Sequence, residues 1–324
     1  MRKYDINLVG ATGTVGQTFL NVLAEERFPV GKLRLFASAS SNGKSIAFKD
    51  EILRTEKLTG SLPESDFTVF ATDVDVSEKY VPAARKTSAF VIDNSSAFRA
   101  DENVPLVIPE INFESIGGGN LIANPNCSTA ICALPVFFLK KRYGLKRLRF
   151  FTYQSVSGSG KSGIEALYGN NDGVYAYDIR KTCIPCVGKP AANGYTTEEN
   201  KMRDEITKIL GEKIPVSATC VRVPVRNCHA VTVSAVLASP FELDDVRKGF
   251  AESEGVVLKD DLDNHVYPVA TEGAASNDVY VGRIRRDAAE ENALVFYALS
   301  DNLRRGAAYN VVRIMQRLIE ADRV

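Results

Sequence analysis

The chain has 324 residues, of which 45% are hydrophobic and 25% are charged. Its 40 Lys and Arg residues balance 40 Asp and Glu residues, so the formal net charge is zero at pH 7. This balance gives no overall field that would attract nucleic acid or an anionic membrane, and the length predicts two domains that can each bury a core.

The N-terminal part alternates short β-branched runs with helical patterns. A run at 6–9 is followed by apolar residues at helical spacing over 15–23 and by an alternating pattern at 33–37, which together predict a βαβ unit. A helix is expected near 77–86. Further strands are expected at 67–71, 90–92, 106–108 and 121–123. These elements predict a mostly parallel, doubly wound, Rossmann-like sheet in an α/β fold.

The segment at 10–16, GATGTVG, follows the first predicted strand and opens the first predicted helix. Small residues there allow backbone amides and the helix dipole to meet a pyrophosphate. The spacing is GxxGxxG and not the common GxGxxG, so the alternative is a turn that only packs the helix against the strand. Its place at the first strand–helix junction favours binding. The candidate contacts are Gly10, Thr12, Gly13, Thr14 and Val15.

The end of the second predicted strand indicates which cofactor is used. NAD sites place a carboxylate there to accept from the ribose hydroxyls, whereas NADP sites omit that charge. Here the sequence 38–44 is SASSNGK, which supplies hydroxyls and a lysine but no carboxylate. NADP is therefore favoured over NAD, with an ordinary polar turn as the alternative. The candidate contacts are Ser38, Ser40, Ser41 and Lys44.

The segment at 124–129, NPNCST, ends a predicted strand and begins a helix. Unsatisfied amides at a helix N-terminus favour a thiolate, so Cys127 is a candidate nucleophile. The alternative, a small buried hydrophobe, suits Cys132 better. Of the two histidines, His265 resembles a turn residue, whereas His229 ends a strand-like run and pairs with Cys127 as a Cys/His catalytic candidate.

The second half of the chain differs in character. The apolar segment 128–143 predicts a helix that Pro135 should kink or restart, because proline removes a helix hydrogen bond. The stretch at 158–200 is expected to form loops and short helices over the site, and apolar residues at helical spacing over 311–318 predict an amphipathic terminal helix. Longer strands, typical of a broad mixed or antiparallel sheet in a second α+β domain, are expected at 149–155, 216–225, 231–238 and 294–299.

Location and metal binding follow from simpler features. The N-terminus resembles no signal peptide and no run approaches a membrane span, so a cytoplasmic location is expected. The six cysteines are expected to be thiols. Cys183 and Cys186 form a CxxC without a second pair, which is weak evidence for zinc, and no metal is expected.

Several independent motifs occur together in this chain, and their order and spacing are specific. They are the segments 9–15, 94–99, 124–129, 153–158, 199–202, 222–229, 282–285 and 300–303. On these motifs, from residue 4 to the terminal helix, the chain resembles the aspartate-semialdehyde dehydrogenase family.

The resemblance implies catalytic roles. Cys127 would attack the aldehyde or the acyl phosphate, His229 would take and return its proton, and Gln154 would orient the reacting centre. It also implies substrate contacts. Arg99 and Lys201 would hold phosphate. The other implied contacts are Arg222 with the substrate carboxylate, Glu199 with its amino group, and Ser157, Gly158 and Asn302 with the nicotinamide end of the cofactor.

The resemblance further implies a dinucleotide-binding domain at 1–127, to which the helix at 303–324 returns, and a catalytic and dimerisation domain at 128–302. The implied reaction interconverts aspartate semialdehyde plus inorganic phosphate with aspartyl phosphate, using NADP, on the route to lysine, methionine and threonine. A homodimer or homotetramer would carry it out.

Three departures and three rivals accompany this interpretation. The family usually has an arginine near Ser40, and Ser-Glu often follows the catalytic histidine where this chain has Ala230-Val231. The segment at 183–186, CIPC, has no recognised counterpart in the family. N-acetyl-glutamyl-phosphate reductase usually has Asn-Pro-Gly-Cys-Tyr around its cysteine, whereas Asn126 and Ser128 flank Cys127 here, which argues against that enzyme. Glyceraldehyde-phosphate dehydrogenase is disfavoured because it has another nucleophile motif and an acidic ribose contact. A non-catalytic, cofactor-binding homologue is disfavoured because all the implied catalytic residues are present together.

Overall fold

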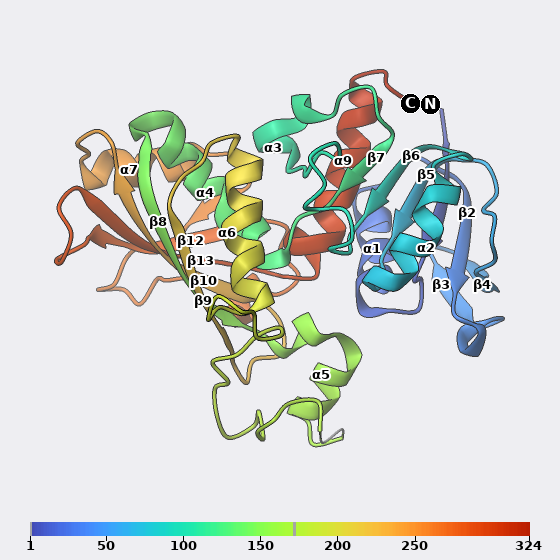
Figure 1. The fold of residues 1–324 in the computed structure, drawn as a ribbon, viewed down its shortest axis with the longest axis horizontal. Helices are drawn as coiled ribbons and strands as arrows, with labels where there is room; N and C mark the ends of the chain where they lie inside the picture. Colours follow the sequence, from blue (N-terminus) through green and yellow to red (C-terminus); the bar gives the residue numbers. More distant parts are fainter. Residues whose placement is uncertain (1, 171–172) are drawn as a thin grey trace. The chain divides into compact units, whose positions relative to one another are not determined.

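The computed structural model describes residues 2–170 and 173–324, and the chain divides into two compact units. Unit 1 consists of the residues up to Pro125 together with Ala307–Val324, and unit 2 is Asn126–Gly306. Sequence analysis placed the boundaries after residues 127 and 302. Figure 1 shows the course of the chain through each unit.

Unit 1 is built around a seven-stranded sheet. Its strands are β1 (Tyr4–Val9), β2 (Val30–Ala37), β3 (Ser45–Phe48), β4 (Glu51–Lys57), β5 (Ser65–Phe70), β6 (Ser88–Asp93) and β7 (Leu121–Ala123). They lie in the order β3-β4-β2-β1-β5-β6-β7, and only the β3–β4 pair is antiparallel. The helices are α1 (Thr14–Glu25), α2 (Val74–Ala84), α3 (Pro109–Asn112) and α9 (Tyr309–Glu320). The expected parallel, doubly wound sheet is confirmed.

One expected strand of unit 1 is not formed. Leu106 makes a single parallel bridge to Ala123 and no longer ladder. Pro105 and Pro109 enclose this segment, and proline cannot donate to a sheet ladder. The β3–β4 hairpin was not predicted, because its strands are short and carry exposed polar residues.

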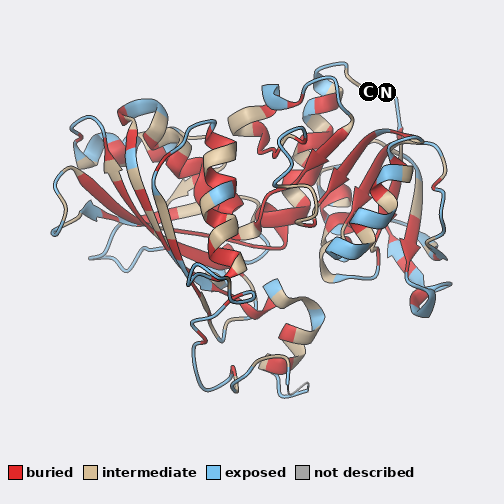
Figure 2. Cartoon of the chain, viewed as in Figure 1, coloured by how far each residue is buried: buried red, intermediate tan, exposed pale blue. Residues whose placement is uncertain are grey.

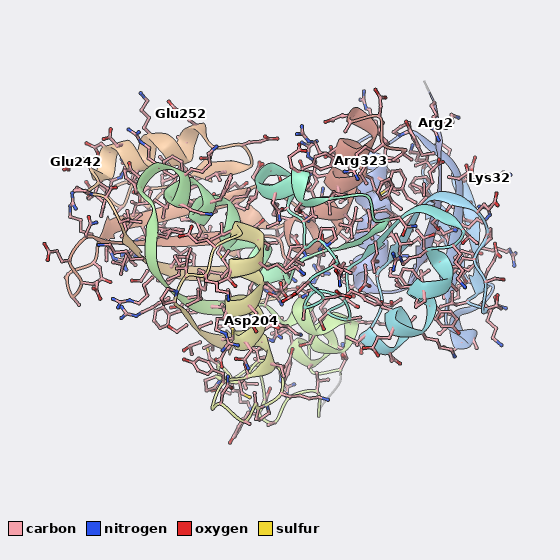
Figure 3. The ribbon with its side chains drawn as sticks, turned by 45° about the horizontal axis from the view of Figure 1, so that its top comes forward. Arg2, Lys32, Asp204, Glu242, Glu252 and Arg323 are labelled. Atoms are coloured by element: carbon pink, nitrogen blue, oxygen red, sulfur yellow. The ribbon has the colours of Figure 1, made fainter. Side chains whose placement is uncertain are left out.

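The C-terminal helix α9 completes the core of unit 1. Val311, Ile314, Met315 and Leu318 are buried in the same apolar cluster as the central strands, and α9 contacts α1 and α3. The chain ends are tied down beside it: Arg2 donates to the backbone oxygen of Val324 at 2.7 Å, and the Arg323 side chain binds the carbonyl groups that follow α3 (Figure 3). The predicted amphipathic terminal helix is confirmed.

Unit 2 is built around a six-stranded mixed sheet. Its strands are β8 (Leu145–Gln154), β9 (Val216–Arg222), β10 (His229–Leu237), β11 (Val256–Leu258), β12 (Val279–Arg286) and β13 (Ala293–Ser300). They lie in the order β11-β12-β13-β10-β8-β9, with β8–β9 and β11–β12 parallel and the remaining pairs antiparallel. The broad mixed sheet expected in the second domain is confirmed.

The long helices α4 (Cys127–Tyr143), α6 (Thr197–Leu210) and α7 (Leu243–Glu252) pack on the sheet of unit 2, and the short helix α8 (Ala270–Gly273) contacts β13. The strands beneath them are largely buried, whereas the outer surfaces of the helices are exposed (Figure 2). The stretch after β8 forms a short turn and α5 (Gly160–Leu167), and the other described residues up to Thr196 form turns and loops. Residues 171–172 of the region expected to form loops and short helices lie outside the described residues.

Helix α4 continues through Pro135, so the restart that was one of the two expected effects of this proline does not occur. Proline removes one hydrogen bond, but α4 is buried along most of its length and packs on β10 and β13, so tertiary contacts hold it together. Within the described residues, no helix combines the length and apolar character needed to cross a bilayer.

Candidate active site

Cys127 is the first residue of α4 and is partly exposed. Asn126 caps the helix, since its side-chain oxygen accepts from the backbone amides of Ser128 at 2.9 Å and Thr129 at 3.3 Å. Cys127 thus lies at the positive end of the α4 dipole, which favours a thiolate. A Cβ added to Gly306 would lie 2.7 Å from the Cβ of Cys127, so any side chain at position 306 would displace the nucleophile.

The other buried thiols differ from Cys127. Burial strongly raises the pKa of Cys132 within α4, which therefore packs as a small apolar residue, as expected. Burial, above all, raises the pKa of Cys220 to about 12, and the neighbouring Glu198 and Cys127 act in the same direction. Cys127 therefore differs from these thiols in lying at the start of a helix. Cys220 on β9 is close enough for the charge of a Cys127 thiolate to raise its pKa.

Two carboxylates of α6 hold the residue that caps the nucleophile helix. The Asn126 backbone amide donates to Oε2 of Glu205 at 2.6 Å, and Nδ2 of Asn126 donates to Oε1 of Glu198 at 2.8 Å. Oε1 of Glu198 also accepts from Nε2 of Gln154 at 3.3 Å, and Oε2 lies 3.9 Å from Nζ of Lys201. Glu198 therefore links the start of α4 to Gln154 and to the predicted phosphate-binding lysine.

Glu199, the predicted partner of the substrate amino group, is engaged elsewhere. It forms a capping box with Thr196: Oε2 of Glu199 accepts from the Thr196 amide at 2.7 Å, and Oγ1 of Thr196 accepts from the Glu199 amide at 3.3 Å. Oε1 of Glu199 accepts from the Cys220 amide at 2.9 Å. Both carboxylate oxygens are thus bound to backbone amides. The Thr-x-x-Glu signature of a capping box was the signal in the sequence that could have identified this role and drawn attention to Glu198.

Gln154 and Arg222 end the parallel neighbours β8 and β9 and lie side by side in register. Both are buried, Gln154 to 1% exposure and Arg222 to 7%. Nη1 of Arg222 donates to the carbonyl oxygen of Ser155 at 2.7 Å. Because the carboxyl ends of parallel strands meet at one edge, this edge brings an amide and a guanidinium to the Glu198 side of the sheet.

His229 opens β10 and is fully buried. Nδ1 of His229 accepts from the Ser155 amide at 3.0 Å, and Nε2 has no hydrogen-bond partner among the described residues. Burial, and next the charge of Arg222, hold the pKa of His229 well below 6.5, with the Cys228 backbone acting weakly in the opposite direction. A Cβ added to Gly158 would lie 2.8 Å from Nη1 of Arg222 and 2.9 Å from Nε2 of His229. Gly158 therefore leaves the space in which these two side chains meet.

The predicted nicotinamide contacts of unit 2 surround His229. Oδ1 of Asn302 is 3.1 Å from Oγ of Ser157 and accepts from the Cys228 amide at 3.1 Å. Both side chains are buried. The structure thus brings Ser157, Gly158 and Asn302 together with Gln154, Arg222 and His229 within unit 2.

The predicted cofactor contacts of unit 1 fit a dinucleotide. Gly10 has φ +88°, and a Cβ there would lie 2.2 Å from the carbonyl oxygen of Ala71, so the turn requires glycine. Gly13 is the N-cap of α1 and, in the described structure, no side chain caps this helix, so its first amides are available to a phosphate. Thr12, Thr14 and Val15 lie in the same turn and at the start of α1.

The polar residues after β2 lie close together. Oγ of Ser38 is 3.0 Å from Oγ of Ser40, and Nζ of Lys44 donates to Oγ of Ser41 at 3.1 Å. Elsewhere in unit 1, Nη2 of Arg99 donates to the carbonyl oxygen of Asn94 at 2.8 Å. The residues after β2 thus form a cluster of hydroxyls and one ammonium, to which Arg99 does not belong.

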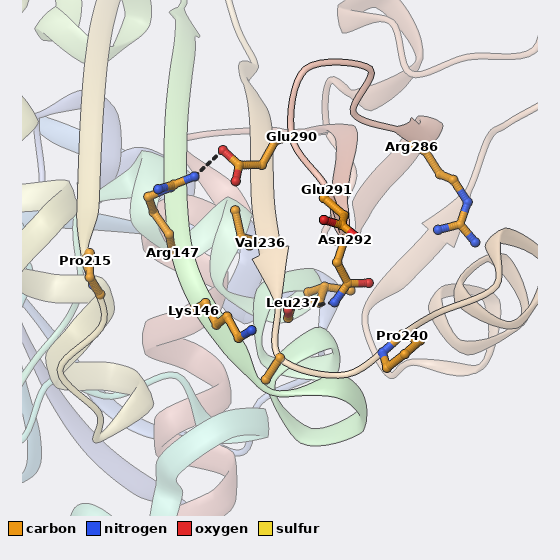
Figure 4. Close-up of a pocket in the computed structure, with 11 residues that line it drawn as sticks. Lys146, Arg147, Pro215, Val236, Leu237, Pro240, Arg286, Glu290, Glu291 and Asn292 are labelled. Atoms are coloured by element: carbon orange, nitrogen blue, oxygen red, sulfur yellow. Dashed lines mark hydrogen bonds and ion pairs between the residues drawn. The ribbon is translucent and has the colours of Figure 1, made fainter.

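A separate pocket of about 880 Å³ in unit 2 contains none of these residues (Figure 4). It lies where β8 begins and β10 ends, and an ion pair of Arg147 with Glu290 borders it. Cys183 and Cys186 are exposed, His265 lies in a turn, and the described residues contain no group of His, Cys, Asp and Glu side chains arranged to hold a metal.

Residues 5–118 match the family described as semialdehyde dehydrogenase, NAD binding domain, and residues 138–305 match semialdehyde dehydrogenase, dimerisation domain. Aspartate-semialdehyde dehydrogenases from Shewanella violacea and Rickettsia bellii are 40% and 37% identical to this chain, over 98% of it and 98% of each relative. The structure of aspartate semialdehyde dehydrogenase II from Vibrio cholerae, complexed with ASA, is 34% identical with a TM-score of 0.94, covering 99% of both chains. The chain therefore belongs to the aspartate-semialdehyde dehydrogenase family.

Proposed function

We propose that the chain interconverts aspartate 4-semialdehyde plus inorganic phosphate with 4-aspartyl phosphate through a thioester on Cys127. The observation that carries this proposal is the position of Cys127 at the capped start of α4, linked through Asn126 and Glu198 to Gln154. The thiolate adds to the aldehyde carbon, and the helix amides stabilise the resulting oxyanion. A bound nicotinamide cofactor, for which Ser157, Gly158 and Asn302 are the candidate contacts in unit 2, would supply the hydride acceptor. Phosphate, for which Lys201 is the candidate ligand in unit 2, then displaces the thiolate.

The test is a steady-state assay with aspartate semialdehyde, phosphate and NADP. We expect turnover that requires phosphate, because water competes poorly with a bound phosphate for the thioester. The N-acetyl-glutamyl semialdehyde serves as the control substrate, and we expect it to react far more slowly. Equal turnover of the two aldehydes, or turnover that does not respond to phosphate, would contradict this reaction.

We propose that Arg222 binds the α-carboxylate of the substrate and that Glu198, in place of Glu199, binds its amino group. A guanidinium and a carboxylate form a directional, charge-assisted pair, and Arg222 lies beside Gln154 in the sheet. Glu198 faces Gln154 and Lys201, whereas both oxygens of Glu199 hold backbone amides. The Vibrio cholerae relative described as complexed with ASA supports a substrate of this class.

A matched pair of variants separates the two glutamates. We expect Glu198→Gln to raise KM for aspartate semialdehyde by about 10-fold or more, because a neutral amide cannot pair with an ammonium. Glu199→Gln should lower the melting temperature and change KM by less than about threefold, since it weakens a helix cap worth about 1 kcal/mol. Kinetics and thermal melts of both variants measure this. A large rise in KM for Glu199→Gln with little change for Glu198→Gln would instead identify Glu199 as the residue that binds the amino group.

We propose NADP as the preferred cofactor. The support is the absence of a carboxylate after β2 together with the close hydroxyls of Ser38 and Ser40 and the contact of Lys44 with Ser41. We expect Ser38→Asp to shift preference toward NAD, because the new charge repels a 2′-phosphate and accepts from ribose hydroxyls. Titration of wild type and variant with both cofactors measures this, and tighter binding of NAD by the wild type would contradict the preference.

We propose that the chain forms a homodimer through the face of the unit 2 sheet that α4, α6 and α7 do not cover. Phe151 and Tyr153 of β8 are 43% and 42% exposed there. In register, Phe151, Thr232 and Tyr297 form a row across β8, β10 and β13. The match of residues 138–305 to a dimerisation domain supports a second copy of the chain as the partner. Sedimentation equilibrium tests it: the mass of one chain would contradict it, and a multiple of the dimer mass indicates further assembly.

The cellular setting follows from this chemistry. An enzyme that reduces aspartyl phosphate supplies aspartate semialdehyde for the synthesis of lysine, methionine and threonine, and we propose that role for this chain. The cysteines in the described residues form no disulfide with one another, which suits the reducing cytoplasm where we place it.

A further inference from the structure

Asn126, the N-cap of α4, has its polar atoms engaged on every side. Its side-chain oxygen accepts from amides of the first helical turn, and its carbonyl oxygen accepts from the Ala130 amide at 2.9 Å. Its Nδ2 donates to Oε1 of Glu198, and its backbone N–H donates to Oε2 of Glu205 at 2.6 Å. Hydrogen bonds in all these directions therefore hold the residue that directly precedes Cys127.

The acceptor for the Asn126 N–H comes from another helix. In a capping box, a glutamate or glutamine at the third helical position reaches back to the N–H of the N-cap. Helix α6 has this arrangement, with Glu199 accepting from the Thr196 amide. In α4 the third helical position is Thr129, whose buried Oγ1 has no hydrogen-bond partner among the described residues. Glu205 of α6 supplies the acceptor that the first turn of α4 lacks.

This arrangement leaves only small side chains beside the nucleophile. Ser128 and Thr129 are fully buried, and the first turn of α4 contains no acidic residue. A glutamate at position 129 would have to fit into this closely packed turn. Glu198 and Glu205 instead approach from one face of α6, where they lie about two turns apart, and both reach Asn126.

The bond between Glu205 and Asn126 is buried and charge-assisted. Glu205 is 4% exposed and Asn126 is 6% exposed. A carboxylate is a stronger acceptor than a neutral oxygen, and a buried N–H without an acceptor is costly. Loss of the acceptor at position 205 would therefore turn the Asn126 peptide group toward another partner. The adjoining Cys127 would turn with it.

We propose that Glu205 is a positioning residue of the reaction. By accepting the Asn126 N–H it completes the cap of α4, and so it sets the direction in which Cys127 presents its sulfur. The kinetic consequence rests on the proposed function, whereas the position of the thiol is a property of the resting protein. Because Glu205 acts through Asn126 and not on the substrate, its loss should lower kcat more than it raises KM.

The first test needs neither turnover nor a disruptive variant. Asparagine is labelled with nitrogen-15 in the wild type, and Asn126→Ser identifies the signal of the Asn126 amide. We expect this amide to exchange slowly with solvent, and its proton to shift upfield in Glu205→Gln, whose neutral oxygen is a weaker acceptor. An Asn126 amide that exchanges as fast as an exposed one, or that does not respond to Glu205→Gln, would overturn the proposal.

The second test compares two variants of equal charge. Glu205→Gln keeps an acceptor oxygen at the same reach, whereas Glu205→Met has a similar length and only a weakly accepting sulfur. We expect iodoacetamide to modify Cys127 about threefold or more slowly in the Met variant than in the Gln variant at pH 7, because the displaced thiol loses the helix dipole that favours the thiolate. The exposed Cys183, followed by mass spectrometry in the same samples, gives the reference rate. Equal rates at Cys127 would contradict the positioning role.

Kinetics complete the comparison. We expect kcat of Glu205→Met to fall about 10- to 100-fold below that of Glu205→Gln, with KM for aspartate semialdehyde within about threefold, since a displacement of about 1 Å can cost 100-fold in rate. The matched control is Ile209→Ala, because Ile209 is buried one turn further along α6 and cannot hydrogen-bond Asn126. It should lower the melting temperature and leave kcat within about twofold.

The outcomes separate this role from the reaction itself. Equal losses of kcat in Glu205→Gln and Glu205→Met would show that the charge matters and not the hydrogen bond, which overturns the proposal. A similar loss in Ile209→Ala at the same melting temperature would make Glu205 a purely structural residue. If the wild type does not turn over aspartate semialdehyde but the alkylation rates differ as expected, the proposed reaction fails and the positioning of Cys127 by Glu205 stands.

Discussion

Cys127→Ser is expected to leave the chain folded and to lower turnover by at least about a thousandfold, because a hydroxyl at neutral pH is a far poorer nucleophile than a thiolate. The cap of α4 depends on the Asn126 side chain and on backbone amides, so serine at 127 leaves that hydrogen bonding in place. Mass spectrometry of the wild type with the acyl phosphate should show an adduct on Cys127.

The matched control is Cys183→Ser, which removes an exposed thiol from the same unit. We expect its kinetics to equal those of the wild type within about twofold, as is usual for a surface substitution. Near-normal turnover of Cys127→Ser, together with an adduct on another cysteine, would rule out the covalent role of Cys127.

Arg222→Lys is expected to lower kcat/KM by a factor that corresponds to a loss of about 2 to 4 kcal/mol in transition-state stabilisation, while leaving the affinity for NADP unchanged. Lysine keeps the charge but loses the planar fork that matches a carboxylate. In the wild type, Nη1 of Arg222 donates to the Ser155 carbonyl at 2.7 Å, and the other guanidinium nitrogens can face a substrate carboxylate. A lysine ammonium cannot reproduce both contacts with this geometry. A misplaced carboxylate would also misplace the reacting carbonyl relative to Cys127.

Arg226→Lys provides the control from the same segment, since the side chain of Arg226 is exposed. We expect its kcat/KM to stay within about twofold of the wild type. Melting temperatures of both variants complete the comparison. A loss of stability in Arg222→Lys with intact kinetics would make Arg222 a packing residue and weaken the assignment of its substrate.

Much of the fold could be predicted because its signals are local. Alternating β-branched runs and helical spacing identified the central strands of unit 1, and a cysteine between a strand end and a helix start pointed to Cys127. The effects of proline were predicted less well. Helix α4 does not restart at Pro135, because packing compensates for the one hydrogen bond that proline removes. The strand expected at 106–108 is limited to a single bridge, because Pro105 and Pro109 enclose it.

Side-chain direction was harder to predict than position. Glu198 and Glu199 are neighbours on one helix, and a step of one residue turns the side chain by about 100°, so one meets Asn126 while the other caps the helix. Nδ1 of His229 accepts a hydrogen bond from the amide of Ser155, 74 residues earlier in the chain. Such a contact exists only after two strands have paired, and no local pattern records it.

The interrupted order of unit 1 has a consequence for the protein during its synthesis. A ribosome completes the seven strands of the first sheet, then makes the whole of Asn126–Gly306, and only afterwards makes α9. Until then the surfaces that Ile314, Met315 and Leu318 cover stay open to water, a state prone to aggregation and recognised by chaperones. The dinucleotide-binding unit is therefore begun first on the ribosome and completed last, and unit 2 can fold while unit 1 still lacks its final helix.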